Sequence, residues 1–554
     1  MANRESENIA ARRQSSLAGA RMILRLNGRR LLMPIALAIF LTFLTGCTSW
    51  RDYIRNGFKV GPNYCPPVAP IANQWIDAAD PNVSNGPANV DAWWRTFNDP
   101  VLDSLIYTAY RQNLSLRVAS FRILEARALR GIAVGELFPQ SQQAFGSYTR
   151  TNNSLNNPNA APNRFTDEWQ TGTSLAWELD FWGRFRRAVE SADANLDASI
   201  YNYDDVLVLL LSEVAQSYIN IRTAEQRLEY AQKNVDDQQV SLNIADLKFR
   251  NGATTRLDVT QGQSNLSQTQ ATIPPLEAAR RQAANRLCIL LGIPPRNIDG
   301  ILAGRSAIPS APPQVAVGIP ADLIRRRPDI RRAEREVASQ SALIGVAASD
   351  LYPHFSITGT IFFDASRFKD LFNANSFAGN VGPSFNWNIL NYGRLVNNIR
   401  VQDARFQQLA YQYQNIVLAA NAEAENALIG FLKAQQSVKY LSTSTSAASE
   451  SLGLVRDQYN AGKTDFNRVV NVEQLLTQQQ DQLAVAQGAV VNNLVLLYKA
   501  LGGGWQIRFG APAETQPIAT AGQSVEPVPV PVPVPGATEV VPSQPSLPPP
   551  PDHP

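Results

Sequence analysis

The chain has 554 residues, 18% of them charged, and a formal net charge of +3. This length is sufficient for a large core or for two domain-sized units, and a weak net charge without a basic stripe excludes a typical nucleic-acid-binding surface. The only histidines are His354 and His553, so a histidine-based metal site and a histidine-dependent catalytic triad are excluded as well.

The N-terminus has the pattern of a secretory signal. Four closely spaced arginines precede an apolar run that ends in Leu-Thr-Gly-Cys at 44–47, and we therefore predict that residues 1–46 are a signal peptide. The ending resembles a bacterial lipobox, which implies N-acyl and diacylglycerol lipid on Cys47; an incidental cysteine after an ordinary signal peptide is the alternative. The acyl chains would anchor the N-terminal segment 47–99 to a membrane. Thr48 in place of aspartate favours the outer membrane, by analogy with bacterial lipoproteins.

Two further cysteines, Cys65 and Cys288, occur in the mature chain. A disulfide between them is compatible with an oxidising periplasm. Two unpaired thiols are the favoured alternative.

The chain contains an internal duplication. Three segments of the first half recur in the second half after 214, 210 and 210 residues: GIAVGELFP (131–139) as GVAASDLYP (345–353), ELDFWGR (178–184) as NILNYGR (388–394), and KFRNGATTRLDV (248–259) as QYNAGKTDFNRV (458–469). Self-similarity at a fixed separation indicates two copies of one unit. We place these repeats at 100–310 and 311–505.

Each repeat is predicted to begin with a helical segment and two strands. The helical segments are expected at 100–138 and 320–352, where Pro328 and Asp329 suit the first turn of the second segment. Apolar and polar residues alternate in the strands expected near 169–179, 354–363 and 377–389, and the signal is weaker in a first strand near 141–150. Such alternation over about ten residues fits a transmembrane β-strand, and equally a half-buried strand of a soluble protein.

Each repeat then continues as a very long helix. The 67 residues from Arg184 to Arg250 contain no proline and no glycine, and the range 394–461 contains only two glycines. Each helix would be roughly 100 Å long at about 1.5 Å per residue, so the helices must pack side by side as coiled coils or bundles. Shorter returning helices are expected at 257–292, interrupted or kinked at Pro274-Pro275, and at 467–501.

The recurring motif is predicted to be the turn between the long helix and the returning helix. Gly252 and Gly462 follow the long helices, and glycine commonly supplies the left-handed residue after a helix C-terminus. Each motif is therefore expected at the tip of a helical hairpin, far from the strands. Beyond the repeats, the proline-rich range 506–554 is predicted to be a disordered tail.

Four membrane strands could not close a barrel by themselves. Outer membrane barrels need about eight or more strands, and an open edge would leave backbone groups unpaired in lipid. If the strands cross a membrane, several chains must share one barrel, with eight strands from two chains or twelve from three. The residues themselves do not choose between these numbers.

Four segments resemble TolC-like outer membrane efflux proteins, in particular the lipoprotein branch that serves resistance-nodulation-division (RND) pumps. They are VGPNY (60–64), WWRTFNDPVLDSLI (93–106), IPADLIRRRPDIRRAE (319–334) and IGVAASDLYPHFSITG (344–359). The resemblance implies a mainly α fold with a small membrane β part, in which duplicated hairpins form an α-helical periplasmic barrel. It also implies a homotrimer with a shared 12-stranded β-barrel in outer membrane lipid. The hairpin tips would then meet a periplasmic adaptor and an inner-membrane RND-type transporter.

The resemblance also assigns residues to the tip. Members of the family narrow the tip with polar contacts, and by motif alignment Asp258 and Tyr459 would form the closing contact. The predicted tip, gate and adaptor-docking residues are Phe249, Gly252, Asp258, Tyr459, Gly462, Thr464, Arg468 and Asn471. Thr464 replaces a frequent basic residue, and Arg468 and Asn471 replace frequent acidic residues. We hypothesise that Arg468 faces Asp258 or lines the tip with positive charge; a solvent-facing Arg468 is the alternative.

The predicted function is a passive outer membrane exit duct of a tripartite efflux system. A duct needs no catalytic residue, and the sequence contains no P-loop, no GxSxG and no metal-ligand cluster, so neither an enzyme nor a metal or cofactor site is expected beyond the lipid on Cys47. The outer membrane arm of type I protein secretion and a structural periplasmic coiled-coil lipoprotein are the alternatives.

Overall fold

The computed structural model describes residues 50–84, 86, 90–154, 156, 163–304 and 307–510. All of them belong to the first of two units into which the chain divides, the one that ends at Ala513. The predicted signal peptide, the lipid site Cys47 and the tail beyond 510 lie outside the described residues. Cys65 is exposed, Cys288 is buried, and both are free thiols.

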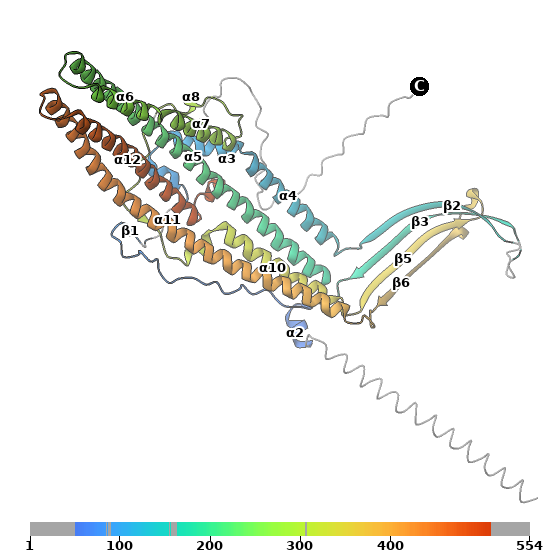
Figure 1. Ribbon diagram of the computed structural model, residues 1–554. Helices are drawn as coiled ribbons and strands as arrows, with labels where there is room; N and C mark the ends of the chain where they lie inside the picture. Colours follow the sequence, from blue (N-terminus) through green and yellow to red (C-terminus); the bar gives the residue numbers. More distant parts are fainter. Residues whose placement is uncertain are drawn as a thin grey trace, which may run out of the picture. The chain divides into compact units, whose positions relative to one another are not determined.

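Two long helical hairpins lie side by side and form most of the described chain (Figure 1). Their long arms are α5 (Arg184–Arg250) and α11 (Arg394–Asn460), which have 67 residues each and confirm the predicted lengths. The returning arm of the second hairpin is α12 (Phe466–Ala500). An 18-residue window of α12 is apolar enough to cross a membrane, but 61% of that window is buried inside the protein, as in a core helix.

The returning arm of the first hairpin is divided in two. It consists of α6 (Arg256–Gln270) and α7 (Ile273–Leu290). Proline is tolerated in the first turn of a helix, where its missing N–H has no partner to lose. Pro274 lies there in α7, so the predicted interruption is confirmed.

The helical segment that opens each repeat lies within the predicted range and is divided in two by a single residue. The first consists of α3 (Pro100–Gln112) and α4 (Leu114–Gly135). Asn113 separates them because its side chain caps α4, accepting from the Leu116 N–H at 2.9 Å, and donates to the Leu290 carbonyl at 2.9 Å.

The second repeat opens with α9 (Asp322–Arg326) and α10 (Pro328–Ser349). Arg327 between them is extended, as expected for a residue that precedes a proline. The predicted position of Pro328 and Asp329 in the first helical turn is confirmed.

Four antiparallel strands form one sheet in the order β2-β3-β5-β6. They are β2 (Ser141–Asn152), β3 (Phe165–Leu179), β5 (His354–Ala365) and β6 (Phe377–Asn386). The last strand is shorter than expected and excludes Trp387 and Ile389. The Trp387 indole donates instead to the Leu351 carbonyl at 3.0 Å, beyond the end of α10.

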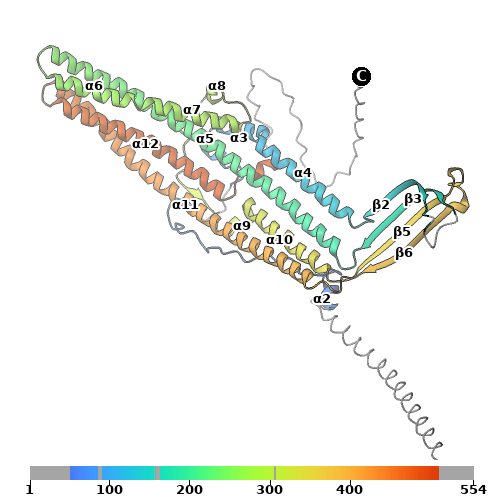
Figure 2. The same cartoon turned by 45° about the vertical axis from the view of Figure 1, so that its right-hand side comes forward.

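The sheet extends from one end of the helices, and the hairpin tips lie at the other end in both views (Figure 1 and Figure 2). Its register gathers apolar side chains on one face. Trp177 pairs with Ile357, and Ile357 pairs with Pro383. Because side chains alternate along a strand, the opposite face carries the polar positions, such as Ser174 and Asn380. The predicted alternation is confirmed in β3, β5 and β6, whereas in β2 Phe145 lies on the polar face and Gln142 on the apolar face.

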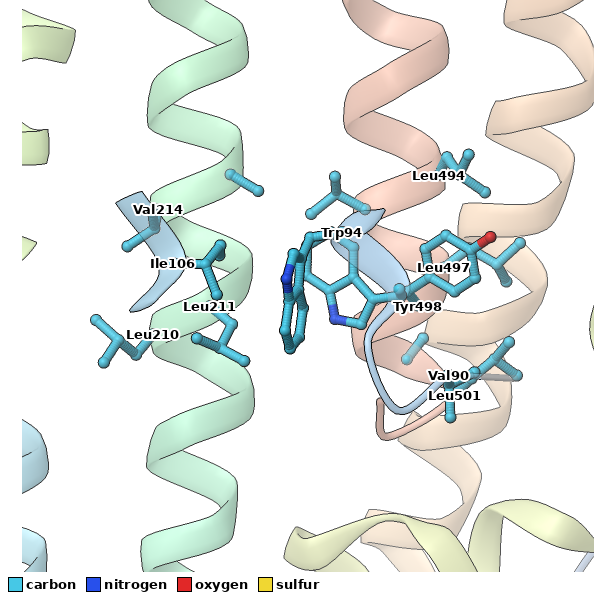
Figure 3. Packing of buried hydrophobic residues seen from close by; sticks show 14 of the residues in the cluster. Val90, Trp94, Ile106, Leu210, Leu211, Val214, Leu494, Leu497, Tyr498 and Leu501 are labelled. Atoms are coloured by element: carbon cyan, nitrogen blue, oxygen red, sulfur yellow. The ribbon is translucent and has the colours of Figure 1, made fainter. Parts of the chain in front are cut away.

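The main core lies between the hairpins and the N-terminal segments. The short 3₁₀ helix η1 (Trp93–Phe97) inserts Trp93, Trp94 and Phe97, each at most 1% exposed. The Trp93 ring stacks on Tyr498 of α12, with centroids 5.7 Å apart. Figure 3 shows Trp94 between Leu211 of α5 and Tyr498. Large aromatic rings therefore join the two repeats here.

The N-terminal segment begins with α2 (Trp50–Arg55), and its short strand β1 (Val83–Ser84) pairs with β4 (Val315–Ala316). The other short elements are α8 (Asp299–Leu302), η2 (Phe368–Asp370), η3 (Ala374–Ser376) and η4 (Trp505–Phe509). The predicted start of the tail at 506 falls inside η4, because Ile507 is buried in the core.

Candidate functional site

The two hairpin tips have the same backbone conformation. Gly252 and Gly462 both have φ +70°, a left-handed conformation that glycine adopts without strain. The residues around each glycine form a Schellman motif, with the bonds Gly252 N–H to Phe249 O (2.9 Å), Ala253 N–H to Lys248 O (2.8 Å), Gly462 N–H to Tyr459 O (3.0 Å) and Lys463 N–H to Gln458 O (2.8 Å). The predicted turns are confirmed in both repeats.

The structure brings Asp258 and Tyr459 together. The Tyr459 hydroxyl donates to Oδ2 of Asp258 at 3.4 Å, which joins the second hairpin to the first. Thr254 also donates to this carboxylate. Tyr459 is 5% exposed, and its ring lies 5.1 Å from that of Phe466. Burial, and then the charge of Asp258, raise the pKa of Tyr459 to about 12, so its hydroxyl keeps the proton that it donates.

A basic residue of the first tip contacts the same tyrosine. Lys248 at the end of α5 donates to the Tyr459 carbonyl, and its Nζ lies 4.1 Å from the centre of the Tyr459 ring. An ammonium at this distance from an aromatic face gains a cation–π interaction. Tyr459 is therefore held to the first hairpin through its hydroxyl, ring and backbone.

The other predicted tip residues do not join this contact. Phe249 is 40% exposed, Thr464 is half-buried, and Arg468 and Asn471 are exposed. The backbone N–H of Arg468 donates to the N-cap Asp465 at 3.0 Å. Within the described chain no hydrogen bond or ion pair joins the Arg468 side chain to Asp258. Its charge therefore remains at the surface of the tip.

Farther from the tip, an ionic cluster around a buried carboxylate joins α5 and α6 of the first hairpin to α11 and α12 of the second. Glu473 of α12 is 3% exposed. Its Oε1 accepts from Arg456 of α11 at 3.1 Å and from Ser241 of α5 at 2.5 Å, and its Oε2 accepts from Asn265 of α6 at 3.0 Å. Arg456 also lies 3.3 Å from Asp237 of α5. We call these five residues the hairpin cluster.

Burial raises the pKa of Glu473, while its hydrogen bonds from Ser241, Arg456 and Asn265 and the charge of Arg456 oppose that shift. Buried polar groups are stable only when they are fully paired. This cluster was not predicted from the sequence. A signal was available, because Glu473 interrupts the buried face of α12 between Val469 and Leu476, and a carboxylate at such a position needs a buried partner.

The sheet carries aromatic residues at both ends of its apolar face. Tyr148 and Trp169 pair at the end far from the helices, with ring centroids 4.4 Å apart. At the other end Phe355 lies 5.4 Å from Phe181 and 6.4 Å from Phe385. An apolar band flanked by two aromatic belts is typical of outer membrane β-barrels.

No cluster of metal-ligating side chains accompanies these features in the described ranges. There, no group of three or more His, Cys, Asp or Glu side chains is placed to hold a metal ion. The tips instead combine contacts that can be made and broken between two hairpins. Such an arrangement fits a conformational or docking role.

Comparisons with known proteins agree with this architecture. Residues 105–293 and 319–503 match the sequence model of a family described as "Outer membrane efflux protein". The chain is similar to nodulation protein T of Rhizobium leguminosarum bv. trifolii, with 31% identity over 476 residues, which are 86% of this chain and 98% of that protein. It is 30% identical over 423 residues to the pyoverdine export outer membrane protein OpmQ of Pseudomonas putida, which are 75% of this chain and 88% of that protein.

A solved structure of the outer-membrane channel OprN has a TM-score of 0.77 and 31% identity, and the match covers 81% of this chain and 99% of that chain. Each matched family segment contains one complete long hairpin. The two aromatic belts and the apolar sheet face account for residence in the outer membrane. The chain therefore belongs to the outer membrane efflux protein family, and it is an outer membrane channel component of an efflux system.

Proposed function

We propose that three copies of the chain form a passive exit duct with one shared barrel of twelve strands and a helical tunnel. An inner-membrane RND-type transporter would supply the energy, and a periplasmic adaptor would dock at the hairpin tips. The open edges of the sheet carry this proposal. In the described chain β2 pairs only with β3, and β6 pairs only with β5.

Unpaired strand edges are not stable in lipid, because the bilayer core offers no water to their backbone groups. All neighbouring strands in the sheet are antiparallel, so β6 of one copy runs antiparallel to β2 of the next. Copies can therefore close into a ring without a parallel pair. The resemblance to TolC-like proteins favours three copies over two.

Exposed apolar side chains on the helices support packing between copies. On α4 they are Leu114, Val118, Phe121, Leu129 and Ile132, each 53–68% exposed. On the membrane-proximal half of α11 they are Val396, Val401, Tyr411 and Leu418. Apolar surface of this extent marks an interaction site. A neighbouring copy that continues the helical layer would cover both faces.

The start of the described chain supports a lipid anchor on Cys47. Tyr53 of α2 donates to the Phe181 carbonyl at 2.7 Å, and Val60 donates to the Trp182 carbonyl at 3.0 Å. These carbonyls follow β3 at the aromatic belt next to the helices. Cys47 precedes α2 by only a few residues, so acyl chains on its thiol and N-terminus would reach the nearby membrane leaflet.

The contacts between the hairpins support a gate at the tip. The Asp258–Tyr459 contact and the hairpin cluster would hold the two hairpins together in a closed duct. Opening would separate the helices and break these contacts, beginning with the one nearest the tip. Exposed residues such as Phe249 and Asn471 remain available for an adaptor.

The mass of the purified particle tests the proposal. Protein extracted from outer membranes in mild detergent is expected to have three times the mass of the mature chain and to conduct ions in planar bilayers. The particle should migrate as a trimer before heating and as a monomer after heating. A monomer that conducts, or a dimer, would contradict the shared 12-stranded barrel.

A further inference from the structure

Two arginines share one aromatic ring at the end of the sheet that lies farthest from the helices. The guanidinium carbons of Arg150 and Arg164 lie 5.3 Å and 5.5 Å from the centre of the Phe165 ring. Asp167 is 3.8 Å from Arg150. We call these four residues the rim cluster. Both arginines gain cation–π contact with the ring, which holds two like charges close together.

The strand register places Arg150, Phe165 and Asp167 of the rim cluster on the apolar face of the sheet, and Arg164 precedes β3 and reaches the Phe165 ring. Tyr148 pairs with Trp169, Arg150 with Asp167, and Asn152 with Phe165. Because every second side chain shares a face, Arg150, Phe165 and Asp167 lie on the same side as the aromatic pair Tyr148–Trp169. Arg150 is only two residues beyond Tyr148, about 7 Å along the strand. Aromatic belts mark the level of lipid headgroups, so the rim cluster lies in the headgroup layer or just beyond it.

The charge of this region is positive. The loop 153–163 between β2 and β3 contains no charged residue. The loop between β5 and β6 adds Arg367 and Lys369 against Asp370, and Phe368 holds this loop to the same face through its ring, 5.0 Å from that of Trp169. Glu168 and Asp364, which lie in the strands nearby, belong to the opposite face.

The guanidinium of Arg150 also remains available to an anionic ligand. The Arg150 side chain is 59% exposed, and its 3.8 Å separation from Asp167 leaves that ion pair loose, while Oδ1 of Asp167 accepts from the Tyr148 hydroxyl at 2.8 Å. Guanidinium groups bind phosphate oxygens through paired N–H donors. Like charges held together repel each other unless an anion lies near both. A phosphate in the headgroup layer would accept from the paired N–H donors and would also reduce the repulsion between the two arginines.

We propose that the rim cluster binds the phosphate of a phosphorylated glycolipid in the outer leaflet of the outer membrane. This inference rests on the proposed membrane barrel, which directs the apolar face toward lipid. Each chain would carry one such site, so a ring of copies would be fixed to the outer leaflet at several points. The site lies at the opposite end of the molecule from the hairpin tips and adds a lipid-binding role to the duct.

Lipid binding to the purified full-length particle tests the proposal. The particle in detergent is titrated with a diphosphorylated glucosamine glycolipid, with its dephosphorylated form and with phosphatidylethanolamine, and bound lipid is counted by native mass spectrometry. We expect the diphosphorylated lipid to bind at least about tenfold more tightly than either of the others. Equal binding of the three lipids would overturn the proposal. Inorganic phosphate at millimolar concentration should not displace the lipid; complete displacement would mean a soluble-anion site instead.

Two double variants locate the site. The Arg150→Gln/Arg164→Gln variant is expected to lose the preference for the phosphorylated lipid. A matched control, Arg281→Gln/Arg296→Gln, removes two exposed arginines from the helical part and should keep it. If the rim variant binds like the wild type, the inference is wrong.

A single variant serves if the double rim variant fails to assemble. Arg150→Lys keeps the charge but removes the paired donors, so it should bind the phosphorylated lipid more weakly than the wild type. Unchanged binding would again overturn the proposal.

The outcome is separable from that of the proposed duct. A particle that conducts in bilayers but shows no lipid preference would leave the duct intact and refute only the rim cluster. A chain that forms no membrane particle would refute the duct itself.

Discussion

The Tyr459 hydroxyl lies 3.4 Å from Oδ2 of Asp258, and this contact joins the tip of the second hairpin to the first turn of α6 in the first. The two residues belong to the two copies of one duplicated turn motif. Asp258 lies six residues after Gly252, and Tyr459 lies three residues before Gly462. One copy thus supplies the acceptor and the other the donor. The duplicated turns have the same backbone but different side-chain roles.

Removal of this donor should favour an open tip. Tyr459→Phe keeps the ring against Phe466 and deletes the hydroxyl. A hydrogen bond of this kind contributes about 0.5–1.5 kcal/mol, so we expect the open-to-closed ratio in planar bilayers to rise by roughly 2- to 12-fold. Tyr440→Phe is the matched control, because Tyr440 lies on the same helix and is 72% exposed. An equal open-to-closed ratio for the two variants would show that the Tyr459 hydroxyl does not hold the gate closed.

Loss of the buried carboxylate in the hairpin cluster should destabilise the fold strongly. Glu473→Ala leaves Arg456 and Asn265 without their shared acceptor, and breaking a buried ion pair costs about 3–5 kcal/mol. Asp481→Asn is the control. The Asp481 side chain is 43% exposed, so its ion pair with Arg227 should contribute less than about 1 kcal/mol to the free energy of unfolding. Denaturation of the purified particle measures both. If Glu473→Ala lowers the free energy of unfolding less than the control does, the hairpin cluster does not stabilise the fold.

The charge of Arg468 should lower the preference of the channel for cations. Its side chain is exposed at the tip, where a duct is narrowest if the tip forms the gate. Arg468→Asp is expected to raise the cation-to-anion permeability ratio roughly twofold or more in 0.1 M salt and less in 1 M salt, where screening is stronger. Arg281→Asp, far from the tip, should change nothing. Unchanged selectivity for Arg468→Asp would mean that this side chain faces the surrounding solvent rather than the pore.

The stability of the helical part should depend on pH through Asp204 of α5. This side chain is fully buried beside Arg508, and burial raises its pKa to about 7 although Arg508 and Arg331 oppose the shift. The folded chain then keeps a proton that the unfolded chain loses near pH 4, so this contribution to stability is full below pH 4 and is lost as the pH rises through about 7.

Asp204→Asn removes this titration. We expect the melting temperature of the wild type to fall, relative to that of the variant, as the pH is raised from 5 to 8. The free energy of unfolding of the wild type, relative to that of the variant, should fall by up to about 1.4 kcal/mol per pH unit. A constant difference between the two proteins across this range would show that Asp204 does not titrate there.

The large elements could be predicted from the sequence because local signals determine them. The absence of proline from Arg184 to Arg250 leaves a helix uninterrupted, Gly252 ends it, and alternation identifies the strands. The break at Asn113 could not be predicted in this way. The sequence around it contains no proline or glycine, and the break depends on a hydrogen bond to Leu290, far along the chain.

The candidate site was predictable only in part. Motif alignment brought Asp258 and Tyr459 together, and the structure places them in contact. The hairpin cluster was missed because its five members lie on four helices, and only the packing of these helices makes Ser241, Asn265 and Glu473 neighbours. Arg468 was predicted as a tip residue from the sequence. Among the described residues of one chain, however, its side chain has no hydrogen-bond or ion-pair partner, so its role could not be read from the fold.

Disulfide formation between β2 and β6 tests the shared barrel most directly. Within one chain these strands are separated by β3 and β5, about 14 Å at the usual strand spacing, which is too far for a disulfide. Ser147→Cys on β2 is combined in turn with Asn380→Cys, Gly382→Cys or Ser384→Cys on β6, all on the polar face. Cys65→Ser and Cys288→Ala remove the other thiols except that of Cys47, which the proposed lipid would occupy.

We expect at least one pair to oxidise to covalent dimers and trimers that persist on denaturing gels without reductant, while the single-cysteine parents remain monomeric. The absence of cross-linked chains for every pair, or products that end at a dimer, would contradict a barrel shared by three copies.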